Sequence, residues 1–479
     1  MLFNSLEFII FLPIVFLLYW FVFRQRRWQN LLVVIASYVF YGWWDWRFLL
    51  LIAFTSFCSY ASGLLIERYE GNRSYQRFIS TSNIVLNLLI LAVFKYFNFF
   101  MDNMETLFLG MGYQLDKVTL DVILPVGISF YTFQALSYTI DVYRKDIRAT
   151  RDMVEFFAYI SFFPQLVAGP IERATNLLPQ FQRDRQFDYT KAVDGCRQML
   201  WGFFKKLVVA DNCAAAVNAY WNDYAELPGF TLFILGFLFT IQIYCDFSGY
   251  SDIAIGCARL FGINLKQNFN FPYFSRSIPE FWRRWHISLM TWFRDYVYFP
   301  LGGSRCAKWK VVRNTLIVYF ISGLWHGANW TYVTWGMYNA VLIVIWLLLG
   351  INTKQKEIVA KGRLLPSLKE SCQVLLTFVL VIIGMSIFRS EDMTQAWGFL
   401  CRMFTTFTED FHVIYARYIL GSLALLFFEW LQRDKQHALQ FSSGSLFSHA
   451  SARYALYAAI VVMLFVFSGE VQTFIYFQF

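Results

Sequence analysis

Apolar runs long enough to cross a bilayer recur along the whole chain, and they restrict its fold more than any other feature. A spanning helix needs about 20 mostly apolar residues because the hydrocarbon layer is roughly 30 Å thick. Runs that approach this length cover residues 8–23, 31–44, 48–66, 79–100, 122–140, 229–256, 314–350, 372–388, 414–431 and 454–468. Charged residues make up 15% of the chain, against about 25% in soluble domains. The sequence therefore predicts an all-α polytopic membrane protein with about ten to twelve transmembrane helices, plus re-entrant or interfacial helices.

The placement of Lys and Arg predicts the orientation of these helices. The loops after the first, third and fifth runs are basic, whereas the loop after the fourth run is mainly acidic. Because basic loops stay in the cytosol, we expect an extracytoplasmic N-terminus. The first run is followed by its basic cluster and lacks a small-residue cleavage site, so we expect a retained helix and not a signal peptide.

Charge and cysteine content exclude two other classes of function. The net charge of +9 is explained by basic cytosolic loops beside a lipid bilayer, so we expect no nucleic-acid partner. The eight cysteines show no CxxC spacing, and we therefore predict neither a zinc site nor a redox site, and no metal.

The chain reads as a single membrane domain, residues 1–479, with three regions. Residues 1–152 form regular spans, residues 153–350 are interrupted by charges and turn residues, and residues 351–479 return to spans after a polar loop. Polar groups and broken helices at membrane depth persist only where protein or a water-filled cavity surrounds them. We therefore expect the chemistry in residues 153–350.

Two interruptions lie early in that middle region. The segment "FFPQLVAGPIER", residues 162–173, contains two prolines and a glycine and predicts either a broken or re-entrant helix or a loop between spans. In "YCDFSGYSDIAIG", residues 244–256, Asp246 and Asp252 are the only charged residues between Glu226 and Arg259. A carboxylate at membrane depth is costly unless it is paired or hydrated. Both acids therefore indicate ion pairs or protonated acids that fix helix packing, or support for catalysis.

A basic segment follows at residues 277–305. Between Pro272 and Arg313 there are eight basic and two acidic residues, a net charge of +6. The aromatic and leucine side chains recur at helical spacing (Phe281, Trp285, Leu289 and Trp292), which predicts a helix at the membrane interface. This helix either binds anionic lipid or receives an anionic cytosolic donor through Arg283, Arg284 and Arg294, because guanidinium groups bind phosphate well. On this pattern His286 shares a seam with Trp282, Met290 and Phe293.

The segment "GLWHGANW", residues 323–330, lies in the longest uncharged stretch. From Asn314 to Thr353 there is no Asp, Glu, Lys or Arg, and His326 is the only side chain that titrates near neutral pH. Most buried histidines are hydrogen-bonded packing residues, and this alternative remains open. Removal from water favours a neutral imidazole with a lone pair that can accept a proton, which suits general-base catalysis on a hydroxyl. Gly323 and Gly327 would allow a close backbone approach or a bend.

Taken together, these motifs resemble the membrane-bound O-acyltransferase family, in the bacterial branch that contains the alginate O-acetylation membrane protein and the D-alanyl transferase of teichoic acids. The resemblance rests on "LVAGPIER", "YCDFSGYSDIAIG", "NFNFPYFSRSIPEFWRRWHISLMTWFRDYVYFPLGG", "LWHGANWTYVTWG", "IFRSEDMTQAWGFL" and the closing "FIYFQF", in that order. It implies a ring of helices around a central funnel or tunnel in a bacterial plasma (inner) membrane. It also implies that His326 matches the essential histidine of the family and His286 the second histidine of this branch.

The resemblance further implies acyl transfer from a cytosolic thioester to a hydroxyl. We expect acetyl-CoA or another acyl thioester as the donor substrate, no bound cofactor, and a polysaccharide acceptor or an extracytoplasmic acetyltransferase partner protein. His326 would be the base, and Asn329, Trp325 or His286 would stabilise the oxyanion.

Four alternatives remain open. One is D-alanyl transfer to teichoic acid. Another is a transporter or exporter of an envelope precursor with Asp246 and Asp252 as coupling-ion sites, which would leave its substrate chemically unchanged. A serine hydrolase is disfavoured because the chain has no GxSxG motif. A structural scaffold for a secretion complex would tolerate the loss of both histidines.

Overall fold

The structure is a computed structural model that describes residues 1–114, 119–120, 123–350, 357–407, 416–441, 446–468 and 472–477. All regular secondary structure in these ranges is helical, and the described residues contain no strand. They group into two compact units, Met1–Ala192 with Cys257–Lys266 and Val193–Gly256 with Gln267–Phe479. These boundaries differ from those of the three predicted regions 1–152, 153–350 and 351–479. The all-helical prediction is confirmed.

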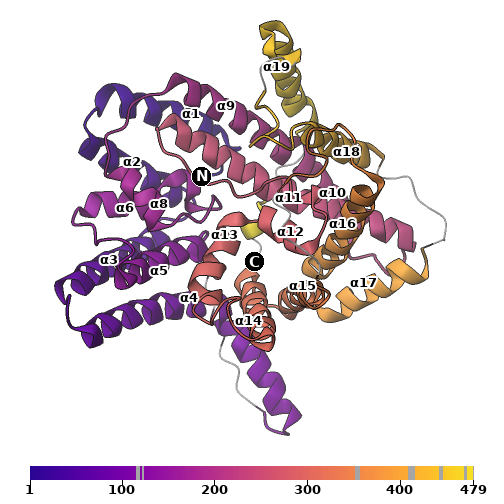
Figure 1. The fold of residues 1–479 in the computed structure, drawn as a ribbon, viewed down its shortest axis with the longest axis horizontal. Coiled ribbons are helices and arrows are strands. Elements are labelled where there is room, and N and C mark those ends of the chain that lie inside the picture. The colour runs from indigo at the N-terminus through magenta and orange to yellow at the C-terminus, as the bar shows by residue number, and fades with distance from the viewer. Residues whose placement is uncertain are drawn as a thin grey trace. The chain divides into compact units, whose positions relative to one another are not determined.

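Unit 1 is built around a buried helix. Its helices are α1 (Leu6–Leu17), α2 (Arg26–Gly42), α3 (Arg47–Arg68), α4 (Arg73–Gly110), α5 (Ile128–Arg144), α6 (Met153–Ser161), α7 (Phe163–Leu166) and α8 (Ala174–Phe181). Helix α5 packs against α3 and α4, and nearly all of its side chains are buried (Figure 1). Helix α2 packs against α6 in the same unit.

The segment of residues 162–173 is buried and mostly non-helical. Its only helical part is the single turn α7, with Pro164 at its start, and both Pro164 and Glu172 are buried. The carboxylate of Glu172 accepts hydrogen bonds from the Asn176 side chain, at 2.6 Å, and from the backbone N–H of Lys266. The segment thus has features of both predicted alternatives: one helical turn, and a buried non-helical stretch that leads to Glu172.

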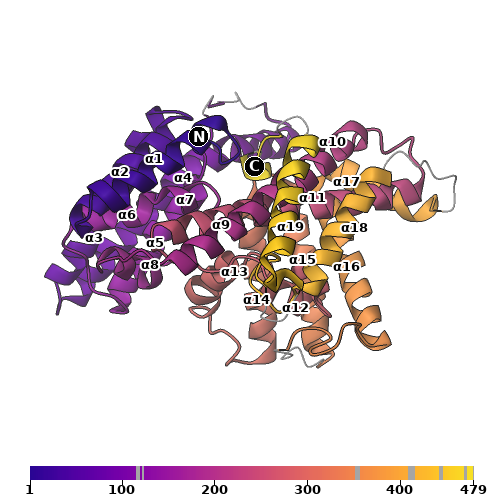
Figure 2. The ribbon, with the colours of Figure 1, turned by 90° about the horizontal axis from the view of Figure 1, so that it is seen from above.

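Unit 2 contains the remaining helices of the described residues. They are α9 (Tyr189–Phe203), α10 (Asp211–Tyr220), α11 (Gly229–Leu260), α12 (Ile278–Arg284), α13 (Ile287–Phe293), α14 (Lys308–His326), α15 (Trp330–Leu348), α16 (Leu368–Arg389), α17 (Met393–Thr405), α18 (Ala416–Leu431) and α19 (Ala450–Phe467). The first four residues of α9 and the last four of α11 belong to unit 1. A π-helical segment, Phe204–Ala210, joins α9 to α10. Helices α14, α15 and α16 lie side by side in both ribbon views (Figures 1 and 2).

Six helices of the described residues are long and apolar enough to cross a membrane. They are α3, α4, α11, α15, α16 and α19, and the shorter apolar segment Leu6–Val22 adds a further candidate. This number is below the predicted ten to twelve. The reason is length and charge: α2 and α5 have 17 residues each, α18 has 16, and α14 begins with Lys308 and Lys310. The chain is a multi-pass membrane protein.

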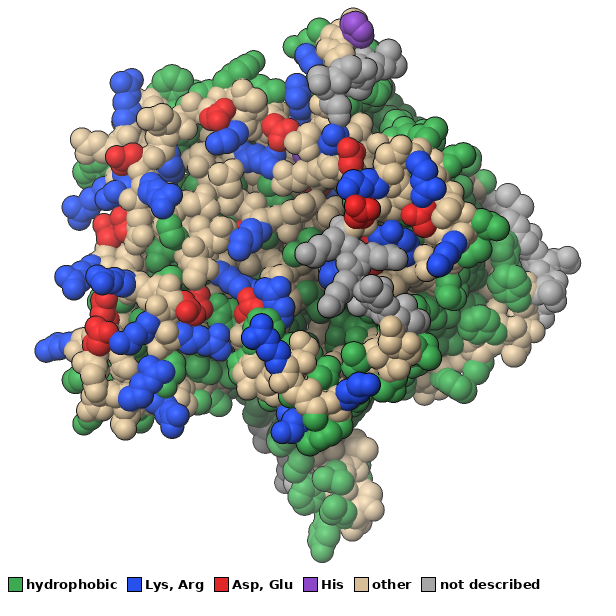
Figure 3. All heavy atoms as spheres, viewed as in Figure 1, with side chains coloured by type: hydrophobic (Ala, Val, Ile, Leu, Met, Phe, Trp, Pro, Cys, Tyr) green, Lys and Arg blue, Asp and Glu red, His purple; other side chains and the backbone are tan. Residues whose placement is uncertain are grey.

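Lys and Arg side chains are scattered over the face shown in Figure 3, among fewer Asp and Glu side chains. Basic surfaces attract anionic lipid headgroups and anionic ligands.

Candidate active site

His326 is the last residue of α14 and lies among aromatic side chains from three helices. Its exposure is 4%, so the predicted burial is confirmed. The ring centroids of Trp325 and Trp335 both lie 4.9 Å from the centroid of the imidazole, and that of Phe388 lies 5.3 Å away. These side chains come from α14, α15 and α16 and surround the imidazole with apolar surface.

Two glycines allow α14 and α15 to approach closely enough to form this aromatic surround. A Cβ atom on Gly323 would lie 2.5 Å from the carbonyl oxygen of Tyr332, and one on Gly336 would lie 2.3 Å from that of Tyr319. Both distances are far below van der Waals contact, so only glycine fits. The close approach predicted for Gly323 is confirmed. Gly327 is extended, with φ −177°, and it ends the helix directly after His326.

Asn329 holds the start of α15. Its Oδ1 accepts a hydrogen bond from the backbone N–H of Thr331 at 2.9 Å, and its Nδ2 donates to the carbonyl oxygen of Glu391 at 2.6 Å. The first contact is that of a helix N-cap. The structure thus shows a helix-capping role for Asn329, which the sequence analysis named as a candidate to stabilise the oxyanion.

His286 occupies a break between two short helices. The spacing of residues 281–292 predicted one continuous interfacial helix, and this prediction was wrong: α12 ends at Arg284, α13 begins at Ile287, and His286 has a left-handed backbone with φ 43°. The predicted grouping of His286 with Trp282, Met290 and Phe293 assumed that continuous helix. A loop residue causes the break, because Asn268 accepts hydrogen bonds from the backbone N–H groups of Ile287 and Ser288 and so caps α13. Left-handed non-glycine residues cost about 1–3 kcal/mol and cluster at functional sites.

The side chain of His286 is also buried among aromatic rings. Its exposure is 1%, and the ring centroid of Phe247 lies 4.7 Å away. Burial lowers the pKa of His286 to about 3. The imidazole is therefore neutral in the ordinary pH range.

Two aromatic side chains, Trp325 and Tyr476, lie close to both histidines. The ring centroid of Trp325 lies 4.9 Å from that of His326 and 5.9 Å from that of His286. The ring centroid of Tyr476 lies 5.8 Å and 6.4 Å from those of the same two histidines. The structure thus brings together His286, Trp325 and His326, which the sequence selected, and adds Tyr476. Of the closing motif "FIYFQF", residues 478–479 lie outside the described residues.

A buried ion-pair cluster holds the segment that carries Tyr476. The Nζ of Lys206 lies 2.8 Å from a carboxylate oxygen of Asp246 and 2.8 Å from one of Asp211. The second carboxylate oxygen of Asp246 accepts a hydrogen bond from the backbone N–H of Ile475 at 2.7 Å. Asp246 therefore links α11 to the residue next to Tyr476. Its role in the structure is to hold the C-terminal segment beside the histidines.

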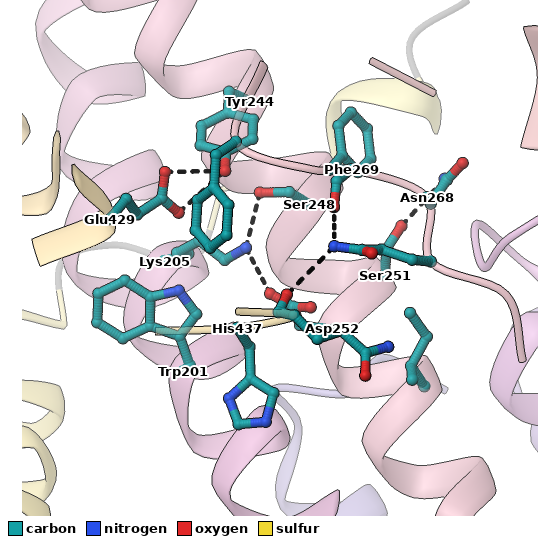
Figure 4. A pocket seen from close by; sticks show the side chains of 14 residues that line it. Trp201, Lys205, Tyr244, Ser248, Ser251, Asp252, Asn268, Phe269, Glu429 and His437 are labelled. Atoms are coloured by element: carbon teal, nitrogen blue, oxygen red, sulfur yellow. Dashed lines mark hydrogen bonds and ion pairs between the residues drawn. The ribbon is translucent and has the colours of Figure 1, made fainter. Parts of the chain in front are cut away.

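Asp252 lies in a second ion pair on the wall of a polar pocket. Its carboxylate lies 2.5 Å from the Nζ of Lys205 and accepts a hydrogen bond from Gln198 at 2.7 Å. Lys205 also donates to Ser248 at 2.9 Å, as Figure 4 shows. The pocket is further lined by Tyr244, Glu429, Asn268 and His437. The ion-pair alternative thus describes Asp246 and Asp252 alike.

The three predicted donor-binding arginines differ in their surroundings. Arg284 is buried and forms an ion pair with Glu280 at 2.9 Å. Arg294 is exposed and pairs with its neighbour Asp295 at 2.6 Å, and Arg283 is exposed. Arg283 and Arg294 can therefore reach a dissolved anion, whereas Arg284 stabilises α12.

Sequence reasoning missed several residues that contact the ones it selected or line the pocket beside them. They are Lys205, Lys206, Asn268, Glu429 and Tyr476. A signal existed for three of them, because the adjacent lysines interrupt the apolar stretch "WGFFKKLVV" and Glu429 interrupts "LALLFFEWL". Asn268 and Tyr476 are ordinary residues in their segments, and only the fold places them beside His286.

Comparison with known proteins identifies the relatives of the chain. A family model described as the membrane-bound O-acyltransferase family matches residues 38–364, which include both histidines. The chain is similar to the "probable alginate O-acetylase" of Pseudomonas aeruginosa, with 41% identity over 407 residues that cover 85% of this chain and 75% of that protein. It is similar to the peptidoglycan O-acetyltransferase of Helicobacter pylori, with 33% identity over 72% of this chain and 70% of that protein. It is also similar to the teichoic acid D-alanyltransferase of Bacillus subtilis, with 30% identity over 46% of this chain and 58% of that protein.

Proposed function

The chain belongs to the membrane-bound O-acyltransferase family, and from this premise we propose that it transfers an acetyl group from a cytosolic thioester, acetyl-CoA, to a hydroxyl of an extracytoplasmic polysaccharide or of a partner protein that modifies the polysaccharide. The observation that carries the proposal is the pair of buried histidines, His326 and His286, which both lie close to the rings of Trp325 and Tyr476. Relatives named for O-acetylation of alginate and of peptidoglycan match most of this chain, which favours acetyl over D-alanyl transfer.

The reaction follows from a neutral imidazole in an apolar site. His326 takes the proton of the acceptor hydroxyl while the hydroxyl oxygen bonds to the thioester carbonyl carbon. The carbon–sulfur bond then breaks, and the thiolate leaves with the proton that His326 held. The products are an O-acetyl ester and free coenzyme A. The apolar rings around His326 exclude water, which would otherwise hydrolyse the thioester.

The two substrates approach the site from opposite sides of the membrane. The donor approaches the basic segment of α12 and α13 from the cytosol, where Arg283 and Arg294 attract its phosphates. The acceptor approaches from the other side of a bacterial inner membrane, the side on which we place the N-terminus. Only the acetyl group then crosses the membrane, through the site itself.

The test uses the purified protein in proteoliposomes. Acetyl-CoA is supplied with alginate oligosaccharides, free coenzyme A is measured with a thiol reagent, and mass spectrometry detects the acetylated sugar. We expect thiol release that depends on the acceptor. Transport of the oligosaccharide without any ester formation would contradict the proposal and support a transporter instead.

A second experiment identifies the natural acceptor. Secreted polysaccharides from cells with and without the gene are compared by mass spectrometry. We expect an O-acetyl ester to disappear when the gene is deleted. Loss of D-alanyl esters with all O-acetyl esters retained would reassign the acyl group.

A further inference from the structure

The orientation of the Asn268 side chain is fixed by its neighbours. Its Oδ1 lies 3.2 Å from the backbone nitrogen of Ser288 and 2.8 Å from the hydroxyl of the same residue. A backbone N–H only donates, so the amide atom that faces it must be the oxygen. The Nδ2 then donates to the hydroxyl of Ser251 at 3.2 Å, on the wall of the polar pocket (Figure 4).

The same amide oxygen determines the tautomer of His286. The Nδ1 of His286 lies 3.1 Å from the Oδ1 of Asn268. Because an amide oxygen only accepts hydrogen bonds, Nδ1 must carry the hydrogen. Burial lowers the pKa of His286 to about 3, so the ring has no second hydrogen in the ordinary pH range. Its Nε2 therefore presents a lone pair.

This lone pair has no partner within the protein as described. The Nε2 of His286 is buried and makes no hydrogen bond to any residue that the structure describes. A buried acceptor without a partner is destabilising, and in native proteins it points to a bound molecule or a reacting group. Trp325 and Tyr476, whose rings flank His286, also flank His326. A substrate group that contacts these two rings would therefore lie near both histidines.

We propose that Asn268 is a positioning residue that fixes His286 in the Nδ1–H tautomer, so that Nε2 accepts a hydrogen bond from a hydroxyl of the acceptor substrate. The proposal rests on the acyl transfer proposed above. It excludes His286 as the donor that stabilises the oxyanion, because the Nε2 of this tautomer has no hydrogen to donate. His286 thus selects and orients the acceptor, while His326 takes the proton.

The tautomer can be observed without any assay of activity. The full-length protein has five histidines, and the ring nitrogens are labelled with ¹⁵N and recorded by NMR in detergent micelles. A variant His286→Gln assigns the His286 signals by their disappearance. We expect a protonated Nδ1 and an unprotonated Nε2 from pH 8 down to about pH 5. A protonated Nε2 would overturn the proposal.

Variants of Asn268 test the consequence for the reaction. Asn268→Leu removes the acceptor, so His286 is free to rotate and change tautomer, and we expect kcat to fall about 100-fold with the KM for acetyl-CoA unchanged. Asn268→Asp keeps the acceptor but places a negative charge beside Nδ1–H, which raises the pKa of His286. We therefore expect activity to be kept at high pH and the acid limb of the pH profile to move upward by about 1–3 units.

The matched control is Asn270→Asp, the same substitution two residues away. The hydrogen bonds of Asn270 to Arg284 use its backbone atoms only, so we expect the pH profile of the wild type. If Asn268→Leu fails to fold, the pH profile of Asn268→Asp decides. Wild-type kcat and pH profile in the Asn268 variants would overturn this inference, whereas a wild-type protein that forms no ester at all would overturn the proposed function instead.

Discussion

Removing the hydrogen bond from the backbone N–H of Ile475 to Asp246 should distinguish an effect on kcat from an effect on the unfolding temperature. Replacing Asp246 with Leu leaves a side chain of similar size that accepts no hydrogen bond. The backbone N–H of Ile475 loses its 2.7 Å partner. Lys206 keeps a carboxylate, because Asp211 lies 2.8 Å from its Nζ. The change thus removes one anchor of the C-terminal segment, while Lys206 stays paired with Asp211 and still donates to the carbonyl oxygen of Gln472 at 3.1 Å.

The magnitude follows from the type of bond. A hydrogen bond to a charged group contributes about 1.5–3 kcal/mol, and a buried donor left without a partner is penalised by a similar amount. A loss of about 2 kcal/mol in the docking of Tyr476 corresponds to roughly a 30-fold change in a rate or a population. We expect Asp246→Leu to lower kcat by at least about tenfold. Asp246→Asn retains a neutral acceptor and should fall between the wild type and Asp246→Leu.

The matched control is Asp211→Leu. It removes the other carboxylate of the Lys206 cluster but leaves the bond between Asp246 and Ile475 intact. The assay measures kcat for acetyl transfer beside thermal unfolding in detergent micelles. We expect both variants to change the unfolding temperature, but only the Asp246 variant to lower kcat beyond about threefold. Equal losses of kcat in the two variants would refute the positioning role of Asp246.

Three further predictions concern charge, pH and packing. Arg283→Gln should raise the KM for acetyl-CoA more at low salt than at high salt, whereas Arg284→Gln should lower the unfolding temperature with KM unchanged; equal KM values for the two variants would contradict this. Burial alone would raise the pKa of Glu280, but its hydrogen bonds with arginines outweigh this and lower it from 4.5. Its stabilising effect is present above pH 4.5 and lost as pH falls through the lower folded-state pKa, so thermal unfolding of Glu280→Gln should converge on the wild type at acid pH; a difference independent of pH would contradict this. Gly323→Ala should cost about 1–3 kcal/mol of stability and lower kcat, because α15 leaves no room for a Cβ. Gly421 has open space around it, so Gly421→Ala should change neither stability nor kcat. Wild-type stability and kcat in Gly323→Ala would be inconsistent with the close approach.

Much of the fold follows from local patterns in the sequence. Every predicted apolar run is helical in its described part, apart from the few residues at the ends of runs and the break at residues 327–329. The burial of His326 follows from the longest uncharged stretch, and the close approach at Gly323 follows from the absence of a side chain at that position. These features depend on periodicity and composition within a single segment, which a sequence displays directly.

The rest depends on contacts between segments that are distant in the chain. Asn268 breaks the helix at His286 from a loop 18 residues away, so the spacing of the aromatic residues alone gave one continuous helix. Lys206, in the π-helical segment Phe204–Ala210, contacts Asp246, and Ile475, more than 200 residues later in the chain, also contacts it. Side chains that meet in this way leave no periodic pattern, and only the tertiary structure identifies them.

The central claim is that the buried imidazole of His326 carries the acyl transfer. The most direct measurement compares the rate of acceptor-dependent coenzyme A release by His326→Ala and His449→Ala, with membrane insertion and yield confirmed for both. His449 is exposed at the start of α19, so His449→Ala should retain the wild-type rate. We expect His326→Ala to insert normally and to lose about 10³-fold in rate. A near-normal rate in that variant would remove His326 from the mechanism.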